Sequence, residues 1–137
     1  MAGFDRMTIA KCFAGALDRC DFAEARTYLS PDCRYDIGAE ELMGPDAIMA
    51  SYASSADRAS RELEQVIYTS EILQQAGESL SVLYTDRIVH AGQTHEYRCR
   101  QLLSFNETGE IVRIVHEELP GQKESLNEFL ARCGIRR

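Results

Sequence analysis

The chain contains no run of about twenty apolar residues, so no segment is long enough to cross a membrane as a helix. Its first residues also lack the basic and then apolar pattern of a secretory signal peptide. We therefore expect a protein that neither spans a membrane nor is secreted, and we place it in the cytoplasm.

Basic residues are too few and too scattered to form a nucleic-acid interface. The chain has 15 Lys and Arg against 22 Asp and Glu, which gives a formal net charge of -7. Phosphate contacts require a dense basic patch, and the arginines at 98, 100, 136 and 137 do not supply one. No nucleic-acid partner is expected.

The five cysteines include no C-x-x-C pair and are odd in number. Without a signal peptide, this pattern indicates reduced intracellular thiols, most of them small core residues. His90 and His95 would be neighbours at the end of a hairpin, but they lack a third ligand for a metal. We expect neither a metal nor a cofactor.

The spacing of apolar residues predicts one α+β domain over residues 1–137. Helix-like spacing covers 7–19, 22–29 and a segment that opens at 44–45, and it returns at 121–133. Residues 33–36 form a short extended piece. Strand-like patterns follow over 63–75, 79–91, 94–105 and 110–118. The helices therefore come first, then a meander of strands, then one terminal helix.

Turn lengths in the second half of the chain place three reactive side chains in one row. A two-residue loop at 92–93 pairs Asp86 with Cys99, and a four-residue loop at 106–109 pairs Cys99 with His116. Because side chains alternate between the faces of a strand, all three would lie on one face. His116 would act as acid or base, with Asp86 as its partner and Cys99 as a buried spacer.

The position of Asp86 depends on the length of one turn. One extra residue at Gly92 would turn Asp86 outward and bring Arg87 to the face that carries His116. That arrangement would suit an anionic ligand better than proton abstraction. Both registers remain open at this point.

Apolar residues occur on both faces of the earlier predicted strands, as in the neighbours Val82 and Leu83. A sheet covered by helices on one face and by another subunit on the other would explain this pattern. We therefore expect a homodimer formed through the outer face of the sheet.

Four segments resemble the NTF2-like superfamily. They cover 17–22 (LDRCDF), 29–35 (LSPDCRY), 44–48 (GPDAI) and 109–112 (GEIV), and they extend across nearly the whole chain. The resemblance implies a cone in which a curved, mostly antiparallel sheet wraps around a pocket closed by the helices. The superfamily includes ketosteroid isomerases, SnoaL-type polyketide cyclases, scytalone dehydratase and limonene epoxide hydrolase, so the fold alone does not settle the function.

Ketosteroid isomerase offers a comparison residue by residue. The resemblance puts Phe13 where that enzyme has an oxyanion-binding tyrosine, Gln101 where it has a protonated aspartate, and Asp36 near its catalytic base. Both oxyanion donors are changed, although a glutamine amide can still donate a hydrogen bond. We do not expect ketosteroid isomerase activity, but Asp36 stays a candidate partner of His116.

The predicted site is the wall of the cone pocket. Its catalytic candidates are His116, Asp86 and Asp36. The residues expected to line it are Phe13, Tyr35, Tyr52, Tyr84, Tyr97, Cys99, Gln101 and Ile114. We expect this pocket to bind a small, largely apolar organic molecule, with cofactor-free acid–base chemistry of the isomerase, dehydratase or cyclase type. The alternative is a non-catalytic dimeric binding or protein-interaction domain.

Overall fold

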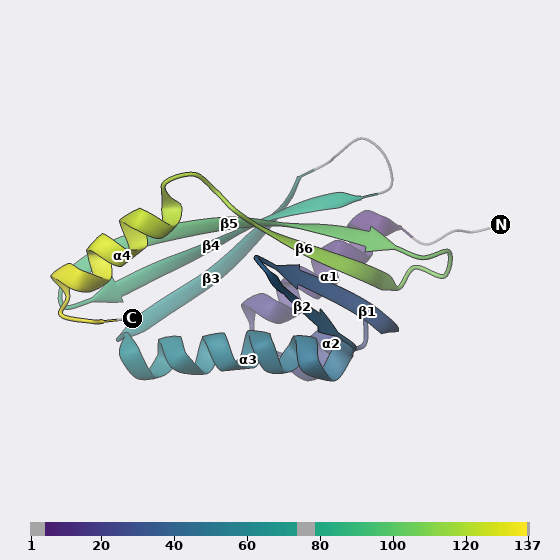
Figure 1. Ribbon diagram of the computed structural model, residues 1–137, viewed down its shortest axis with the longest axis horizontal. Helices are drawn as coiled ribbons and strands as arrows, with labels where there is room; N and C mark the ends of the chain where they lie inside the picture. The colour runs from purple at the N-terminus through teal and green to yellow at the C-terminus, as the bar shows by residue number, and fades with distance from the viewer. Residues whose placement is uncertain (1–4, 74–78, 137) are drawn as a thin grey trace.

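The computed structural model describes residues 5–73 and 79–136. Its elements in chain order are α1 (Arg6–Asp18), α2 (Phe22–Arg26), β1 (Leu29–Ile37), β2 (Glu40–Met43), α3 (Pro45–Glu62), β3 (Gln65–Leu73), β4 (Leu80–His90), β5 (Gln93–Phe105), β6 (Ile111–Glu118) and α4 (Gln122–Arg132). The strands form one curved sheet in the order β2-β1-β6-β5-β4-β3 (Figure 1). β1 runs parallel to β6, and the other four pairings are antiparallel. The predicted α+β class with a curved, mostly antiparallel sheet is confirmed. None of the described helices is long and apolar enough to cross a membrane.

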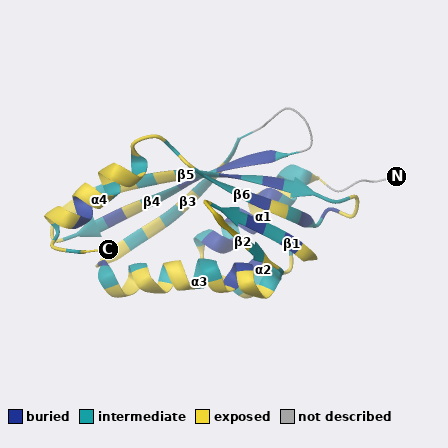
Figure 2. Cartoon of the chain, viewed as in Figure 1, coloured by how far each residue is buried: buried dark blue, intermediate teal, exposed yellow. Residues whose placement is uncertain are grey.

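The helices pack on one face of this sheet, which we call the inner face. α1 contacts β3 and β4, α3 contacts β1, and α4 contacts β5. Phe13 of α1 lies in one core cluster with Tyr35, Tyr84 and Ile114 from the strands. Phe129 of α4 belongs to a second cluster at the other end of β4. Figure 2 shows that α3 is buried at its end near α2 and more exposed toward its other end.

Three predicted helices are confirmed to within one or two residues, and their first turns show why they begin there. The Asp5 carboxylate accepts the Met7 N–H at 3.0 Å, which satisfies one of the free donors at the start of α1. α3 begins with Pro45, whose missing N–H has no partner to lose at that position. Its capping residue, Gly44, has φ 90°, a backbone angle that glycine adopts without strain.

The segment after α2 was predicted wrongly. We expected helix through Leu29, but α2 ends at Arg26 and Leu29 is the first residue of β1. Pro31 lies inside β1, where the pairing with β6 shifts between Leu29 and Arg34. A proline has no N–H to donate to a ladder, so it is tolerated at such an irregularity. The hairpin partner β2 was not predicted at all.

The turn between β4 and β5 consists of Ala91 and Gly92, not of Gly92 and Gln93 as we predicted. Both residues have positive φ, 50° and 73°, as a type I′ hairpin turn requires. The register therefore shifts by two residues, and Asp86 pairs with Tyr97. Because a shift of two preserves the alternation of faces, Asp86 still shares a face with Cys99. Arg87, the open alternative, is exposed on the opposite face.

The turn between β5 and β6 spans 106–110 and is one residue longer than the predicted four. The ladder ends with Phe105 opposite Ile111, and the register changes once more between Ser104 and Phe105. These two single-residue shifts place Gln101, not Cys99, opposite His116. Together the two shifts move the register by two residues. His116 therefore stays on the predicted face, but the predicted row of Asp86, Cys99 and His116 is wrong.

Phe13 is fully buried, with its ring edge-on to Tyr52 at 6.5 Å between centroids. We predict that Phe13→Ala lowers the free energy of unfolding by about 3–5 kcal/mol, because it removes a large ring from a packed core. Urea denaturation measures this loss. The matched control is Met43→Ala on β2, where the side chain is 55% exposed and the expected loss is below about 1 kcal/mol. Equal losses in the two variants would contradict this core.

Candidate functional site

The buried amide of Gln101 joins four elements on the inner face. It donates from Nε2 to the Tyr35 hydroxyl of β1 at 3.0 Å, and its Oε1 accepts from the Tyr52 hydroxyl of α3 at 2.7 Å. The Tyr35 and Tyr52 rings stack with 5.3 Å between centroids. Burial raises the pKa of Tyr35 to about 12, so its hydroxyl stays protonated at neutral pH. Tyr35, Tyr52 and Gln101 were all predicted to line the pocket. The structure brings them together, and their polar groups bind one another.

His116 has both ring nitrogens in contact with polar groups. The Gln101 Nε2 lies 3.2 Å from Nδ1. An amide nitrogen only donates, so Nδ1 accepts and the neutral ring carries its proton on Nε2. Nε2 lies 3.3 Å from Oε2 of Glu118. His116 is therefore held in one tautomer, as a donor to Glu118.

Glu118 is a residue that the sequence reasoning missed. Both of its carboxylate oxygens accept from the Tyr97 hydroxyl, at 2.7 and 2.6 Å. Burial opposes its ionisation, but the hydrogen bonds from Tyr97 and His116 outweigh burial and lower the pKa of Glu118. The available signal was alternation, because Glu118 is two residues after His116 and so lies on the same face.

Asp86 lies on the inner face between Tyr68 of β3 and Tyr97 of β5. It is half-buried, and no residue in the described part of the chain gives it a hydrogen bond or an ion pair. Burial, followed by the nearby charge of Asp18, raises the pKa of Asp86 to about 6. A carboxyl group with that pKa exchanges protons close to neutral pH.

The structure does not bring Asp86 and His116 together as predicted. Asp86 pairs with position 97 of β5 and His116 with position 101. At roughly 3.3 Å per residue, they are offset by about 13 Å along the strand direction. The pair of Cys99 and Glu118 occupies the position between them. Asp86 and His116 therefore face the same side of the sheet but cannot touch one atom of a small molecule together.

Asp36 lies on the other face of the sheet. Its carboxylate is 3.0 Å from Nε of Arg34 and 2.8 Å from Nη2 of Arg113. Hydrogen bonds from Arg34, followed by those from Arg113, lower its pKa. The alternation of β1 that turns Tyr35 inward turns Asp36 outward. The structure thus separates Asp36 from the inner-face candidates.

The other predicted lining residues occupy the inner face with different roles. Cys99 is half-buried, and burial, together with the charges of Asp86 and Glu118, raises its pKa to about 12. A neutral thiol at that position is a spacer rather than a nucleophile. Phe13 and Ile114 are fully buried members of the main core cluster.

The two histidines at the hairpin end are not cross-strand partners. His95 pairs with Ile88 and stacks on Phe129 of α4 at 5.1 Å, whereas His90 accepts the Glu64 N–H through Nδ1 at 3.2 Å. Within the described ranges, no three His, Cys, Asp or Glu side chains come together in a way that could hold a metal.

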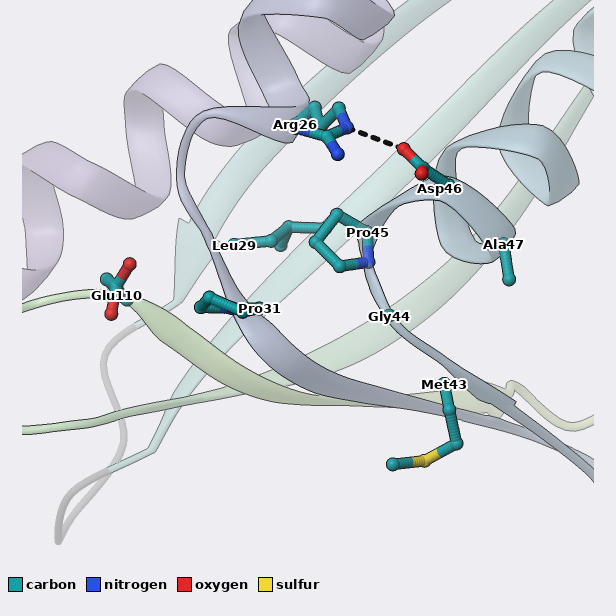
Figure 3. A pocket seen from close by; sticks show the side chains of 9 residues that line it. All are labelled: Arg26, Leu29, Pro31, Met43, Gly44, Pro45, Asp46, Ala47 and Glu110. Carbon is teal, nitrogen blue, oxygen red and sulfur yellow. Dashed lines mark hydrogen bonds and ion pairs between the residues drawn. The ribbon is translucent and has the colours of Figure 1, made fainter.

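A hollow of about 450 Å³ lies at the N-terminus of α3 (Figure 3). It is lined by Arg26, Leu29, Pro31, Met43, Gly44, Pro45, Asp46, Ala47 and Glu110. Arg26 and Asp46 pair with each other across it at 2.7 Å. None of the candidate residues on the inner face lines this hollow, and its charged pair is already satisfied.

No family model matches the sequence, and no curated protein matches it either.

The fold is similar to those of solved structures. One is an NTF2-like protein of unknown function from Burkholderia pseudomallei (TM-score 0.66, 17% identity, 89% of this chain and 95% of that chain). Another is an NTF2-like protein of unknown function from Cytophaga hutchinsonii (TM-score 0.62, 15% identity, 87% and 94%). A third, described as a candidate polyketide cyclase, comes from Xanthomonas campestris (TM-score 0.60, 17% identity, 93% and 96%). At these identities the comparison shows the fold alone: the chain has the NTF2-like fold.

We predict that Asp86→Asn stabilises the protein at neutral pH, because it removes a half-buried charge that has no partner among the described residues. The folded pKa of about 6 lies above the unfolded value of 3.8, so protonated Asp86 favours the folded state. Its contribution is therefore fully present below about pH 4 and is lost as pH rises through 6, a loss on the order of 3 kcal/mol.

Urea denaturation at pH 4, 6 and 8 measures this effect. The wild type should lose stability relative to Asp86→Asn between pH 4 and 8. Glu107→Gln is the control and should leave the pH profile of stability unchanged, since Glu107 is exposed in the turn between β5 and β6, away from Asp86 and from the outer face of β3. A less stable Asp86→Asn variant at pH 8 would show that Asp86 has a stabilising partner.

Proposed function

We propose that the inner face binds a small organic molecule beside Asp86, and that Asp86 removes a proton from it without a cofactor. The observation that carries this proposal is the Asp86 carboxyl group itself. It is half-buried, has a pKa near 6, and receives no hydrogen bond or ion pair from any part of the chain described above. Structural carboxylates in protein interiors are normally paired, so an unpaired one at this depth suits a proton acceptor.

The neighbours of Asp86 support a binding surface at this place. Tyr97, its cross-strand partner, presents a hydroxyl held by Glu118, and Cys99 adds an uncharged thiol two residues away. All of these side chains are only half-buried or exposed, in contrast to the fully buried Phe13 and Ile114. A ligand with a largely apolar body would lie against the rings and reach Asp86 with one acidic C–H.

His116 then acts as a positioning residue. Its Nε2–H faces Glu118, which in turn holds the Tyr97 hydroxyl. This chain of hydrogen bonds fixes the Tyr97 side chain beside Asp86, with its hydroxyl proton directed to Glu118, so that the Tyr97 ring packs against the ligand while Asp86 takes the proton. Isomerisation, dehydration and aldol-type cyclisation all begin with such a C–H deprotonation beside a carbonyl group.

A second candidate is binding without chemistry. It is favoured by the closed hydrogen bonding of Gln101 and His116, which leaves neither residue with an obvious free donor for an oxyanion. In that case the inner face would hold a carrier ligand, or would serve a domain whose task is protein interaction.

Deuterium exchange distinguishes the two candidates. We predict that the protein incorporates deuterium from D₂O next to the carbonyl of at least one compound in a panel of small ketones and enones that binds the inner face, as followed by NMR. Asp86→Asn should lower that exchange rate by at least about 100-fold while the dissociation constant changes less than about threefold.

His116→Ala should lower the exchange rate less than Asp86→Asn does, because it acts through Glu118. Glu71→Gln serves as the unaffected control. Binding on the inner face without exchange in the wild type would select the carrier function. Compounds that bind only elsewhere would exclude both candidates.

The outer face supports a homodimer, which we propose as the assembly. It carries the apolar residues Ile67, Leu73, Leu83, Leu102 and Val115, and no described helix covers it. Ile67 is 42% exposed, which is unusual for a large aliphatic residue in the middle of a strand.

Analytical ultracentrifugation tests this assembly. We predict twice the 15.4 kDa chain mass for the wild type and a shift toward the single-chain mass for Ile67→Glu, because a buried carboxylate would disrupt the contact. Ala50→Glu, on the exposed side of α3 and away from the outer face of the sheet, should leave the mass unchanged. A wild-type protein with the single-chain mass at micromolar concentration would exclude the dimer.

A further inference from the structure

Asp18, the last residue of α1, brings a second carboxylate to the inner face beside Asp86. The hydroxyl of Ser70 on β3 donates to Asp18 Oδ2 at 2.6 Å. Ser70 pairs across the strands with Tyr84, and the next inner-face pair along β3 and β4 is Tyr68 with Asp86. Asp18 is thus anchored above Ser70, next to Tyr84 and diagonal to Asp86.

Tyr84 presents an unsatisfied polar group beside Asp18. Only 9% of the residue is exposed, and its hydroxyl is buried without a hydrogen-bond partner among residues 5–73 and 79–136. Burial, followed by the charge of Asp18, raises the pKa of Tyr84, which shows that the hydroxyl lies within the field of that carboxylate. Buried hydroxyl groups are almost always hydrogen-bonded, so this one indicates a partner that binds from outside.

The carboxylates of Asp18 and Asp86 have no positively charged partner among the described residues. Asp18 and Asp86 are both half-buried, and neither forms an ion pair with a residue in the described part of the chain. Arg19 lowers the pKa of Asp18 somewhat, but its guanidinium contacts the exposed Glu24 at 3.0 Å. Burial dominates, and the pKa of Asp18 is raised like that of Asp86. Two carboxylates and one free hydroxyl oxygen together lack a cationic hydrogen-bond donor.

We propose that Asp18, Tyr84 and Asp86 form a subsite for a positively charged nitrogen, so that the ligand of the inner face is an amine in its ammonium form. The ammonium group donates to Asp18 and to the Tyr84 oxygen, while the ring of Tyr97 offers a further face for a cation. Asp18 is the counter-ion, which leaves Asp86 free to accept a proton from the adjacent carbon. This inference rests on the proposed binding function and specifies its substrate class. A hard divalent cation fits less well, because it needs six or more oxygen ligands.

Three probes of the same shape and different charge test the subsite: benzylamine, benzyl alcohol and benzoate. Each is titrated into ¹⁵N- and ¹³C-labelled full-length protein at pH 7.5, and the resonances of Asp18, Tyr84 and Asp86 are followed by NMR. We expect benzylamine to bind at least about tenfold more tightly than benzyl alcohol, and benzoate to bind more weakly than either.

Two variants assign the preference to these side chains. Asp18→Asn keeps an oxygen that accepts from Ser70 and so preserves the anchor. It should weaken benzylamine by about tenfold and change benzyl alcohol by less than about twofold. Tyr84→Phe keeps the ring in the core and should weaken benzylamine by about threefold. Glu71→Gln, on the opposite face of β3, should change neither probe.

The outcomes separate this inference from the proposed function. Should all three probes bind the inner face with equal affinity, the binding function stands and the ammonium subsite is wrong. An unchanged benzylamine affinity in Asp18→Asn also overturns the subsite. Should no probe shift the inner-face resonances at tens of millimolar concentration, a level that even weak fragment binding reaches, both proposals fail.

Discussion

The buried amide of Gln101 is the interaction on which the inner face depends. Its three contacts reach Tyr35 on β1, Tyr52 on α3 and His116 on β6, so one side chain fixes a helix and two strands relative to β5. A buried amide is stable only when its donors and acceptor are all satisfied. This requirement sets the tautomer of His116, which then orients Glu118 and Tyr97. The polar lining is therefore a connected network.

The end of the inner face near α1 differs from this network, because several polar groups there have no partner in the described part of the chain. Among the described residues, neither Asp18 nor Asp86 has an ion-pair partner, and the Tyr84 hydroxyl beside Asp18 has no hydrogen-bond partner. Folding must overcome the cost of these groups in every molecule, bound or free. Such a cost is typical of binding and catalytic sites, which trade stability for function.

The sequence could predict the faces of the strands but not their pairing. Alternation has a period of two, so shifts of two residues at Gly92 and around Phe105 left Asp86 and His116 on the predicted face while moving them out of one row. A positive φ at Ala91 and a bulge near Ser104 are properties of the folded chain that residue types do not reveal. Asp18 was not found because its contact with Ser70 joins positions 52 residues apart. Contacts between distant segments carry no local signal.

Asp86 is a half-buried carboxylate with no hydrogen-bond or ion-pair partner among residues 5–73 and 79–136. Its side-chain carboxyl ¹³C shift, followed from pH 3 to 9 in the free protein, measures this directly. We predict a titration midpoint near 6, well above the 3.8 of an ordinary aspartate. Asp18→Asn should move that midpoint downward, because it removes the neighbouring negative charge. A midpoint at or below 4 in the wild type would mean that Asp86 is solvated or paired, and would contradict both the proton acceptor and the subsite built around it.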